Sequence, residues 1–203
     1  MTDMTGGGAP RTYDLEPAAR RIALLAEGVG DHQLTDPTPC PGVAVRNVLG
    51  HLIGLSAAFR DAGRKELGPR TSTPGDAAAP DIDDEGAWRA ELPEVLAELT
   101  AVWRDPAAWE GMTPAGGVTV PAMEAGRVAV NELVVHGWDL ARATGQPYQP
   151  DPTSLEASYA ILAPSADHRP AGGPFGPAVA VPADAPLLDR VIGLSGRDPA
   201  WTP

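Results

Sequence analysis

The run VNELVVHGWDL at residues 130–140 carries the clearest structural pattern in the chain, and it lies within a longer segment, residues 121–144. Apolar residues recur there every three or four positions, which is the periodicity of an amphipathic α-helix. Gly145 follows the segment, and glycine readily ends a helix in the left-handed conformation. We therefore expect a helix over residues 121–144 with one face buried against its neighbours.

Three earlier segments share this helical periodicity and define the fold class. They are residues 14–29, residues 43–62 and residues 83–103, the last of which opens with two aspartates that can cap a helix. Pro93 should kink or restart the third of these helices. Four amphipathic helices joined by loops predict an all-α protein, specifically a four-helix bundle whose core faces can hold a functional site.

The C-terminal part of the chain is rich in proline and glycine and predicts shorter elements. Residues 152–162 can form a helix capped by Asp151, and residues 185–194 can form another. Strand-like alternation is confined to two short pieces, residues 117–120 and residues 178–181. The expected architecture is a four-helix bundle with a Pro/Gly-rich C-terminal extension and one or two short extra helices.

Length and the distribution of turn-forming residues indicate a single domain. The chain has 203 residues, enough for one core, and its 23 glycines and 23 prolines cluster between the predicted helices. Residues 1–12 predict a disordered or extended tail, and residues 13–203 predict one domain that includes the C-terminal extension. Residues 69–84 are acidic and proline-containing, which indicates a solvated connection within that domain.

Charge and cysteine usage exclude several classes of function. With 15 basic and 27 acidic residues, the formal net charge of −12 opposes binding to nucleic acid or to anionic membranes. The first residues lack the apolar stretch of a secretory signal, and a single cysteine forms no intrachain disulfide. We expect a cytoplasmic protein that acts on a small molecule, either as a monomer or as a homodimer.

Two polar residues share one side of the helix expected at residues 121–144. Positions four apart on a helix differ by about 40° around its axis, so Glu132 and His136 project in the same direction. Apolar residues flank both of them on that side. His51 lies in the same way on the apolar stripe of the helix expected at residues 43–62, where an imidazole has no local partner.

Two imidazoles and one carboxylate on two helices can hold a divalent metal and leave a fourth position for water or substrate. In the alternative interpretation, Glu132 and His136 simply hydrogen-bond each other, and His51 is a satisfied core histidine. The residues alone leave both interpretations open. A dication would, however, offset the cost of burying an ionised Glu132.

Two further residues, Asp139 and Cys40, can lie close to the same site. Asp139 is three residues beyond His136 and can orient its imidazole from behind, or can instead pair with Arg142 or Arg127 at the surface. Cys40 stands between two prolines with no evident base, which favours a small packing group over a nucleophile.

Two motifs resemble the mycothiol-dependent maleylpyruvate isomerase N-terminal family of the wider DinB-like superfamily. One is PTPCPG at residues 37–42 followed by LGHLIG at residues 49–54, and the other is ELVVHGWDLARATGQ at residues 132–146. Four C-terminal pieces are similar to the actinobacterial-type metal-binding subgroup: FGP at 175–177, VP at 181–182, LLDR at 187–190 and GRDP at 196–199. The resemblance runs from about Tyr13 to Trp201.

This resemblance implies a four-helix bundle that binds a divalent metal, most commonly zinc or nickel. The ligands it implies are His51, Glu132 and His136, the same three residues that share the apolar helix faces. It further implies a thiol-dependent transferase or isomerase that acts on a small electrophilic molecule, with mycothiol as a candidate co-substrate.

The chain departs from the family pattern at two positions near the expected site. Val43 stands where the pattern usually has tryptophan, and Asn47 stands where it usually has aspartate. These departures keep open a non-catalytic metal-binding or sensing module, and a metal-dependent enzyme of specialised metabolism that uses no thiol. Oxygen chemistry on ferrous iron, which also uses two histidines and one carboxylate, ranks last because the scaffold is helical.

Overall fold

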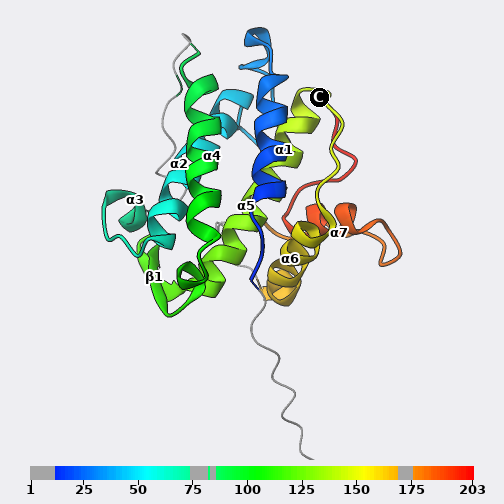
Figure 1. The fold of residues 1–203 in the computed structure, drawn as a ribbon. Helices are drawn as coiled ribbons and strands as arrows, with labels where there is room; N and C mark the ends of the chain where they lie inside the picture. Colours follow the sequence, from blue (N-terminus) through cyan, green and yellow to red (C-terminus); the bar gives the residue numbers. More distant parts are fainter. Residues whose placement is uncertain (1–11, 74–81, 83–85, 169–175) are drawn as a thin grey trace, which may run out of the picture.

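The computed structural model describes residues 12–73, 82, 86–168 and 176–203. Four long helices make up the bundle in Figure 1: α1 (Glu16–Glu27), α2 (Val45–Gly63), α4 (Trp88–Trp103) and α5 (Ala122–Ala143). Both α1 and α2 pack against α4 and against α5, so the four helices enclose a common core. The predicted all-α four-helix bundle is confirmed.

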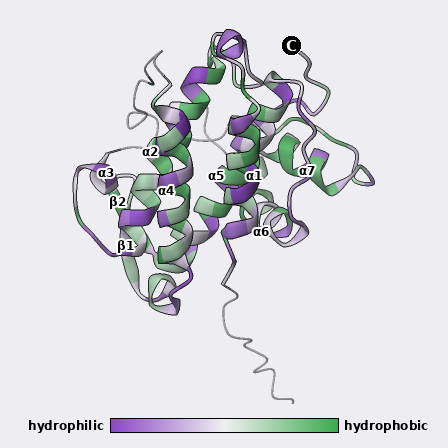
Figure 2. Ribbon diagram, turned by 45° about the horizontal axis from the view of Figure 1, so that its top comes forward, coloured by the Kyte–Doolittle hydropathy of each residue, from purple (hydrophilic) through white to green (hydrophobic). Residues whose placement is uncertain are grey.

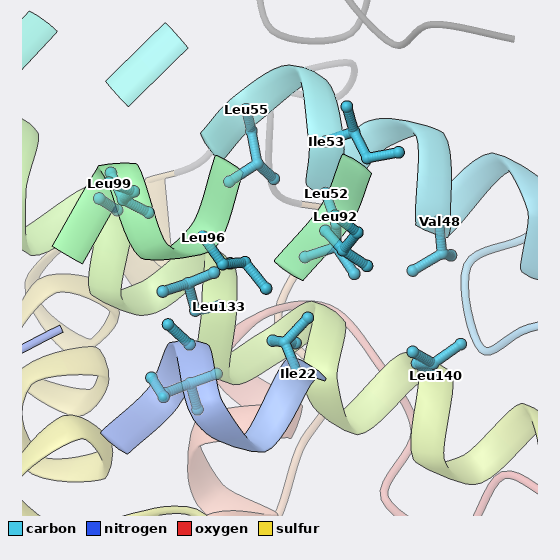
Figure 3. Close-up of a cluster of buried hydrophobic side chains, with 14 of the residues drawn as sticks. Ile22, Val48, Leu52, Ile53, Leu55, Leu92, Leu96, Leu99, Leu133 and Leu140 are labelled. Atoms are coloured by element: carbon cyan, nitrogen blue, oxygen red, sulfur yellow. The ribbon is translucent and has the colours of Figure 1, made fainter. Parts of the chain in front are cut away.

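The core lies between the four helices and is built from the apolar stripes that the periodicity predicts. Figure 3 shows Ile22, Leu52, Leu92 and Leu133 meeting from α1, α2, α4 and α5, and all four side chains are fully buried. Burying one such side chain contributes about 1.5–3 kcal/mol. In Figure 2 hydrophilic and hydrophobic residues occur on the same helices, as amphipathic packing requires.

Shorter elements surround the bundle. They are α3 (Pro69–Ser72), α6 (Pro152–Leu162), α7 (Leu187–Leu194), the 3-10 turns at Asp31–Gln33, Pro106–Trp109 and Ala163–His168, and the strands β1 (Met112–Ala115) and β2 (Val118–Pro121). Helix α6 packs against α5, and α7 packs against α6, so the two extra helices extend one side of the bundle (Figure 1). Among the described residues, no helix combines the length and apolar character needed to cross a membrane.

Two helix ends form as their residues predict. The Asp151 side chain accepts a hydrogen bond from the backbone N–H of Ser154 at 3.0 Å, which caps α6, and Pro152 occupies its first turn. After α5, Gly145 adopts a φ of 68°, the left-handed conformation expected of it.

The strand expected at residues 117–120 is one half of a β-hairpin. Strand β1 pairs antiparallel with β2, with Ala115 opposite Val118 across the turn. Gly116 and Gly117 have φ of 60° and 82°, and two positive values in succession are typical of a tight hairpin turn. Strand β1 was not predicted, because Pro114 stands within it and a proline argues against a strand. The hairpin leads directly into α5 and fixes where that helix begins.

The strand expected at residues 178–181 does not form. These residues run as an irregular segment, and the backbone N–H of Val179 donates to the carbonyl oxygen of Gly193 at the end of α7. This single backbone hydrogen bond holds the segment against the end of α7, but it does not form a paired strand. The helix predicted at residues 185–194 begins slightly later, at Leu187.

Other predictions along the chain have mixed outcomes. Helix α4 runs through Pro93 without a break, so the restart expected there does not occur. The connection at residues 69–84 contains the short helix α3, which was not predicted. Asp83 and Asp84, expected to cap the third helix, lie outside the described residues, as does the predicted tail except for residue 12.

The packing of the C-terminal extension can be tested at Gly193. A Cβ atom added there would lie 2.4 Å from Cγ2 of Val181 and 2.7 Å from the backbone oxygen of Val179. We expect Gly193→Ala to lower the free energy of unfolding by about 1–3 kcal/mol, despite the better helix propensity of alanine. Urea denaturation measures the difference. Gly176→Ala is the control, because a Cβ there meets no atom within 4 Å, and equal stability of the two variants would contradict the packing.

Candidate metal centre

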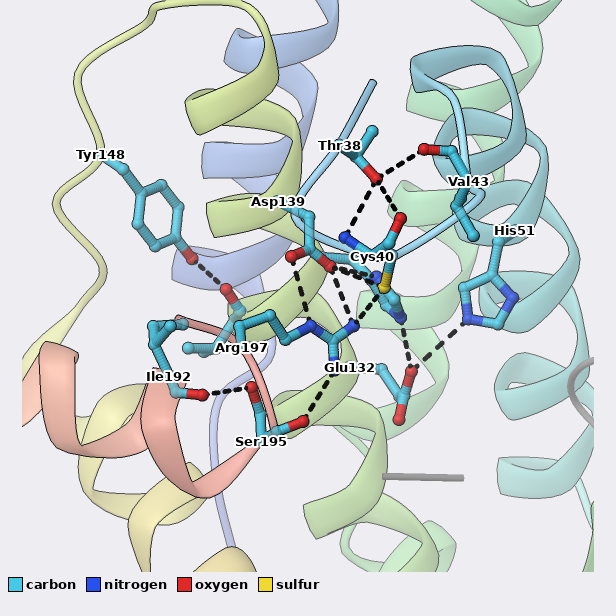
Figure 4. Close-up of polar contacts among 12 residues, drawn as sticks. Thr38, Cys40, Val43, His51, Glu132, Asp139, Tyr148, Ile192, Ser195 and Arg197 are labelled. Carbon is cyan, nitrogen blue, oxygen red and sulfur yellow. Dashed lines mark hydrogen bonds and ion pairs between the residues drawn. The ribbon is translucent and has the colours of Figure 1, made fainter. Parts of the chain in front are cut away.

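Helices α2 and α5 bring three predicted residues together at their contact. Figure 4 shows His51 extending from α2 toward Glu132 of α5. His136 lies one helical turn beyond Glu132 on α5. The buried residues Leu52 and Leu133, each next to a site residue in the sequence, belong to the core. The same amphipathic pattern that buries the leucines therefore sets the three polar side chains beside one another.

The potential ligand atoms of these three residues converge. Oε2 of Glu132 lies 3.1 Å from Nε2 of His136 and 3.5 Å from Nε2 of His51. One donor atom from each residue lies within 4.8 Å of the other two, and the two imidazole rings meet edge to face with centroids 4.6 Å apart. Donor atoms at these separations can all reach a single ion with small side-chain adjustments.

The cluster is partly accessible to solvent. The side chains of His51, Glu132 and His136 are 24%, 16% and 13% exposed, respectively. A site made of three protein ligands with access from solvent leaves room for a water molecule or a substrate atom, which is the arrangement of catalytic metal sites.

The cluster changes the proton affinity of its members. Burial disfavours the charged form of Glu132, but hydrogen bonding to His136 and His51 outweighs burial and holds the pKa of the carboxyl well below its usual range. Burial likewise opposes charge on His136, but its contacts with Asp139 and Glu132 raise its pKa to about 9. Without a metal, a proton on His136 therefore supplies the positive charge that Glu132 requires.

Asp139 lies directly behind His136. Its side chain is fully buried, and Oδ2 is 3.0 Å from Nδ1 of His136. Hydrogen bonding to His136 and the charge of Arg197 outweigh burial and lower the pKa of Asp139, so the carboxylate accepts and Nδ1 donates. Of the two arrangements considered from the sequence, the structure has the contact with His136. Arg142 donates instead to the carbonyl oxygen of Pro199.

Arg197 belongs to this cluster although no pattern in the sequence indicates it. Its guanidinium group is buried and donates to both carboxylate oxygens of Asp139, at 3.3 Å from Nε and 3.0 Å from Nη2 (Figure 4). The motif GRDP at residues 196–199 marked this region as similar to a family subgroup, but nothing local indicates what its arginine contacts.

Cys40 has a polar environment that was not predicted. Its sulfur lies 3.0 Å from Nη2 of Arg197 and 3.8 Å from Oδ2 of Asp139. Burial raises the pKa of the Cys40 thiol to about 11; the negative charge of Asp139 adds to this effect, and the positive charge of Arg197 opposes it. A raised pKa favours the protonated thiol at neutral pH, and the expectation that Cys40 is not a nucleophile stays a prediction.

The two departures from the family pattern have structural roles. Oδ1 of Asn47 accepts a hydrogen bond from the backbone N–H of Ala44 at 3.0 Å, which an aspartate would also do at the start of α2. Val43 packs against the hydrophobic core, and its carbonyl oxygen accepts from the Thr38 hydroxyl. Both residues shape the start of the helix that carries His51.

The donor set fits a divalent transition metal. Two imidazole nitrogens and one carboxylate oxygen are ligands that zinc and nickel accept, and the low pKa of Glu132 keeps its carboxylate ionised. The contact with Asp139 holds the proton of His136 on Nδ1 and so directs Nε2 toward the other two candidate ligands.

The fold and this cluster define the chain as a DinB-like helical bundle with a histidine–glutamate–histidine site between two helices. A family profile described as the mycothiol maleylpyruvate isomerase N-terminal domain matches residues 15–141. That match covers more than half of the chain, and the protein belongs to this family, which is named after an isomerase. The family resemblance inferred from the sequence is confirmed.

Two sequence relatives cover nearly the whole chain. They are uncharacterized proteins from two strains of Mycobacterium tuberculosis, each 28% identical over 186 residues, which is 87% of this chain and 91% of the relative.

Two solved structures have a similar fold. The crystal structure of the mycothiol-dependent maleylpyruvate isomerase matches with a TM-score of 0.56 at 19% identity, and a mutant of that enzyme matches with 0.53 at 20%. Each match covers 73% of this chain and 66% of the other chain, so this chain spans slightly less than two thirds of the isomerase.

The protonated state of Cys40 can be tested by alkylation. At pH 7 we expect iodoacetamide to modify the folded protein about 100-fold more slowly than an exposed thiol of ordinary pKa, and the rate should increase until about pH 11. Mass spectrometry of samples quenched over time gives the rate at each pH. Cys40→Ser provides the blank, since the chain has no other cysteine. A rate that levels off below pH 9 would contradict this environment.

Proposed function

We propose that this protein is a metal-dependent enzyme that uses a thiol co-substrate to isomerise or modify a small electrophilic molecule. The observation that carries the proposal is the convergence of His51, Glu132 and His136 at a partly exposed site on the fold of a thiol-dependent isomerase family. Mycothiol is the thiol in the names of that family and of the solved relatives, and it is the first candidate here.

His51, Glu132 and His136 would hold the metal, with zinc or nickel as the best fit to their donor atoms. A divalent metal at this position supplies Lewis acidity and lowers the pKa of a bound thiol or water, so that a nucleophile exists at neutral pH. The protein itself contributes the orientation of the ligands. Asp139 keeps the His136 proton on Nδ1, and the core leucines of α2 and α5 fix the distance between the two helices.

The chemistry we propose for the thiol is reversible addition to an activated double bond. The thiolate forms a carbon–sulfur bond, the former double bond rotates as a single bond, and elimination restores both the double bond and the thiolate. No oxidant or reductant is consumed. We do not assign Cys40 as the attacking group, because burial raises its pKa to about 11 and disfavours the thiolate, and the proposal takes the thiol from a co-substrate.

Two alternatives remain to be distinguished by experiment. A metal-dependent enzyme without a thiol would use a water molecule at the same position. A non-catalytic metal-binding module was considered because of Val43 and Asn47. Since Asn47 caps α2 and Val43 packs against the core, these two departures give the module less support than they did in the sequence alone.

The ligand assignment is tested by metal content. We expect the wild-type protein purified without chelators to retain about one equivalent of zinc or nickel, and His51→Ala and His136→Ala to lose most of it, because two protein ligands hold such an ion poorly. Elemental analysis by mass spectrometry measures the content. His32→Ala is the matched control, since His32 is an exposed histidine outside the site. Equal metal in all four proteins would exclude this assignment.

The thiol requirement is tested by turnover. We expect the metal-loaded protein to isomerise a cis-configured unsaturated dicarbonyl acid only when mycothiol is added, and His51→Ala to reduce the rate at least 100-fold. Absorbance of the conjugated substrate follows the reaction. Turnover of electrophilic esters without any thiol would favour the hydrolytic alternative. Tight metal binding with no turnover of either kind would favour the non-catalytic module.

A further inference from the structure

Arg197 connects three parts of the chain at a point directly behind the candidate metal centre. Besides its two contacts with Asp139 on α5, it donates from Nη1 to the carbonyl oxygen of Ser195 at 3.0 Å. Its Nη2 also lies 3.0 Å from the sulfur of Cys40, in the turn that precedes α2. The guanidinium group is thus in contact with the helix that carries two of the candidate ligands and with the approach to the helix that carries the third (Figure 4).

The contact with Asp139 continues to the site. Oδ2 of Asp139, which accepts from Nη2 of Arg197, is the same oxygen that accepts from Nδ1 of His136. On its other side, Nε2 of His136 faces Oε2 of Glu132. A continuous row of polar contacts therefore runs from the C-terminal segment to the potential ligand atoms.

The backbone around Arg197 is fixed by the end of α7. The N–H of Arg197 donates to the carbonyl oxygen of Ile192, and the N–H of Gly196 donates to that of Gly193. With a φ of 86° at Gly196, these two bonds form the glycine-dependent helix cap known as the Schellman motif. The cap determines the direction in which the chain leaves α7 and so places Arg197 against Asp139.

A buried arginine and a buried aspartate are costly to desolvate, and as a pair they stabilise a fold little more than apolar residues would. Stability alone thus gives no strong reason for this pair. The orientation of the His136 ring explains the pair better. A two-pronged contact from a planar guanidinium fixes the plane of a carboxylate, and the carboxylate in turn fixes the orientation of the imidazole.

We propose that Arg197 is a positioning residue of the metal centre and that the C-terminal segment completes the site through Asp139. The inference rests on the proposed metal centre. It extends the site beyond residues 15–141, the part that the family profile matches, to a residue of the C-terminal extension.

The first test is a cycle of substitutions read out as zinc affinity, measured by competition with a chromogenic chelator. Arg197→Lys keeps the positive charge but lacks the planar two-pronged donor, and we expect it to weaken zinc binding about tenfold. In an Asp139→Asn background, Arg197→Lys should have little further effect, because the carboxylate through which it acts is absent. Arg142→Met is the control, since Arg142 also donates to the C-terminal segment, at Pro199, whereas the hydrogen bonds of the Asp139 carboxylate are with His136, Arg197 and Cys40.

Wild-type affinity in Arg197→Lys, or an equal loss in both backgrounds, would overturn the proposal.

Hydrogen exchange of the wild-type protein provides a second test that does not depend on folding of a variant. If the segment supports the metal centre, zinc must in turn stabilise the segment, so exchange at the amides of Ser195 and Arg197 should slow when zinc is added. Slower exchange in α2 and α5 alone would refute the role of Arg197. A wild-type protein that binds no zinc would instead refute the metal centre itself.

Discussion

The carboxylate of Glu132 is only 16% exposed and has an imidazole on either side, His136 at 3.1 Å and His51 at 3.5 Å. An ionised carboxylate so far removed from water costs several kcal/mol unless a positive charge accompanies it. Without a metal, His136 supplies this charge from α5 itself, whereas a metal held by all three residues would require α2 and α5 to keep their spacing. Leu52 and Leu133, buried beside these residues, provide that spacing, and the packing of the bundle and the chemistry of the site therefore depend on each other.

Helical periodicity was sufficient to predict the part of the site that lies on α2 and α5. Residues four apart on a helix must share a face, so Glu132 and His136 could be paired without knowledge of the fold, and the apolar stripe around His51 indicated a second buried polar group. The side of α5 on which Asp139 lies followed from the same geometry. The helical periodicity could not predict the partners of Asp139, because one of them lies in a segment distant in the sequence.

Arg197 could not be predicted because its contacts arise from the path of the chain and from no local pattern. It meets Asp139 across 58 positions of sequence and Cys40 across 157. The one local signal is Gly196, whose position after an apolar helical segment is typical of a helix cap and fixes the direction in which the next residue leaves the helix. Strand β1 of the hairpin before α5 was missed for a related reason, since its pairing with β2 defines it and its own residues do not.

The charges around the site are consistent with an anionic ligand once a metal is bound. Glu132 and Asp139 carry two negative charges and Arg197 carries one positive charge, which leaves a net negative charge among these buried groups. In the metal-free protein, the proton on His136 neutralises this net negative charge. A dication requires neutral imidazoles and would displace that proton, and the site would then carry one net positive charge. A thiolate is the kind of ligand that such a charge favours, whereas burial and the neighbouring carboxylate of Asp139 favour the neutral thiol of Cys40 in the metal-free protein.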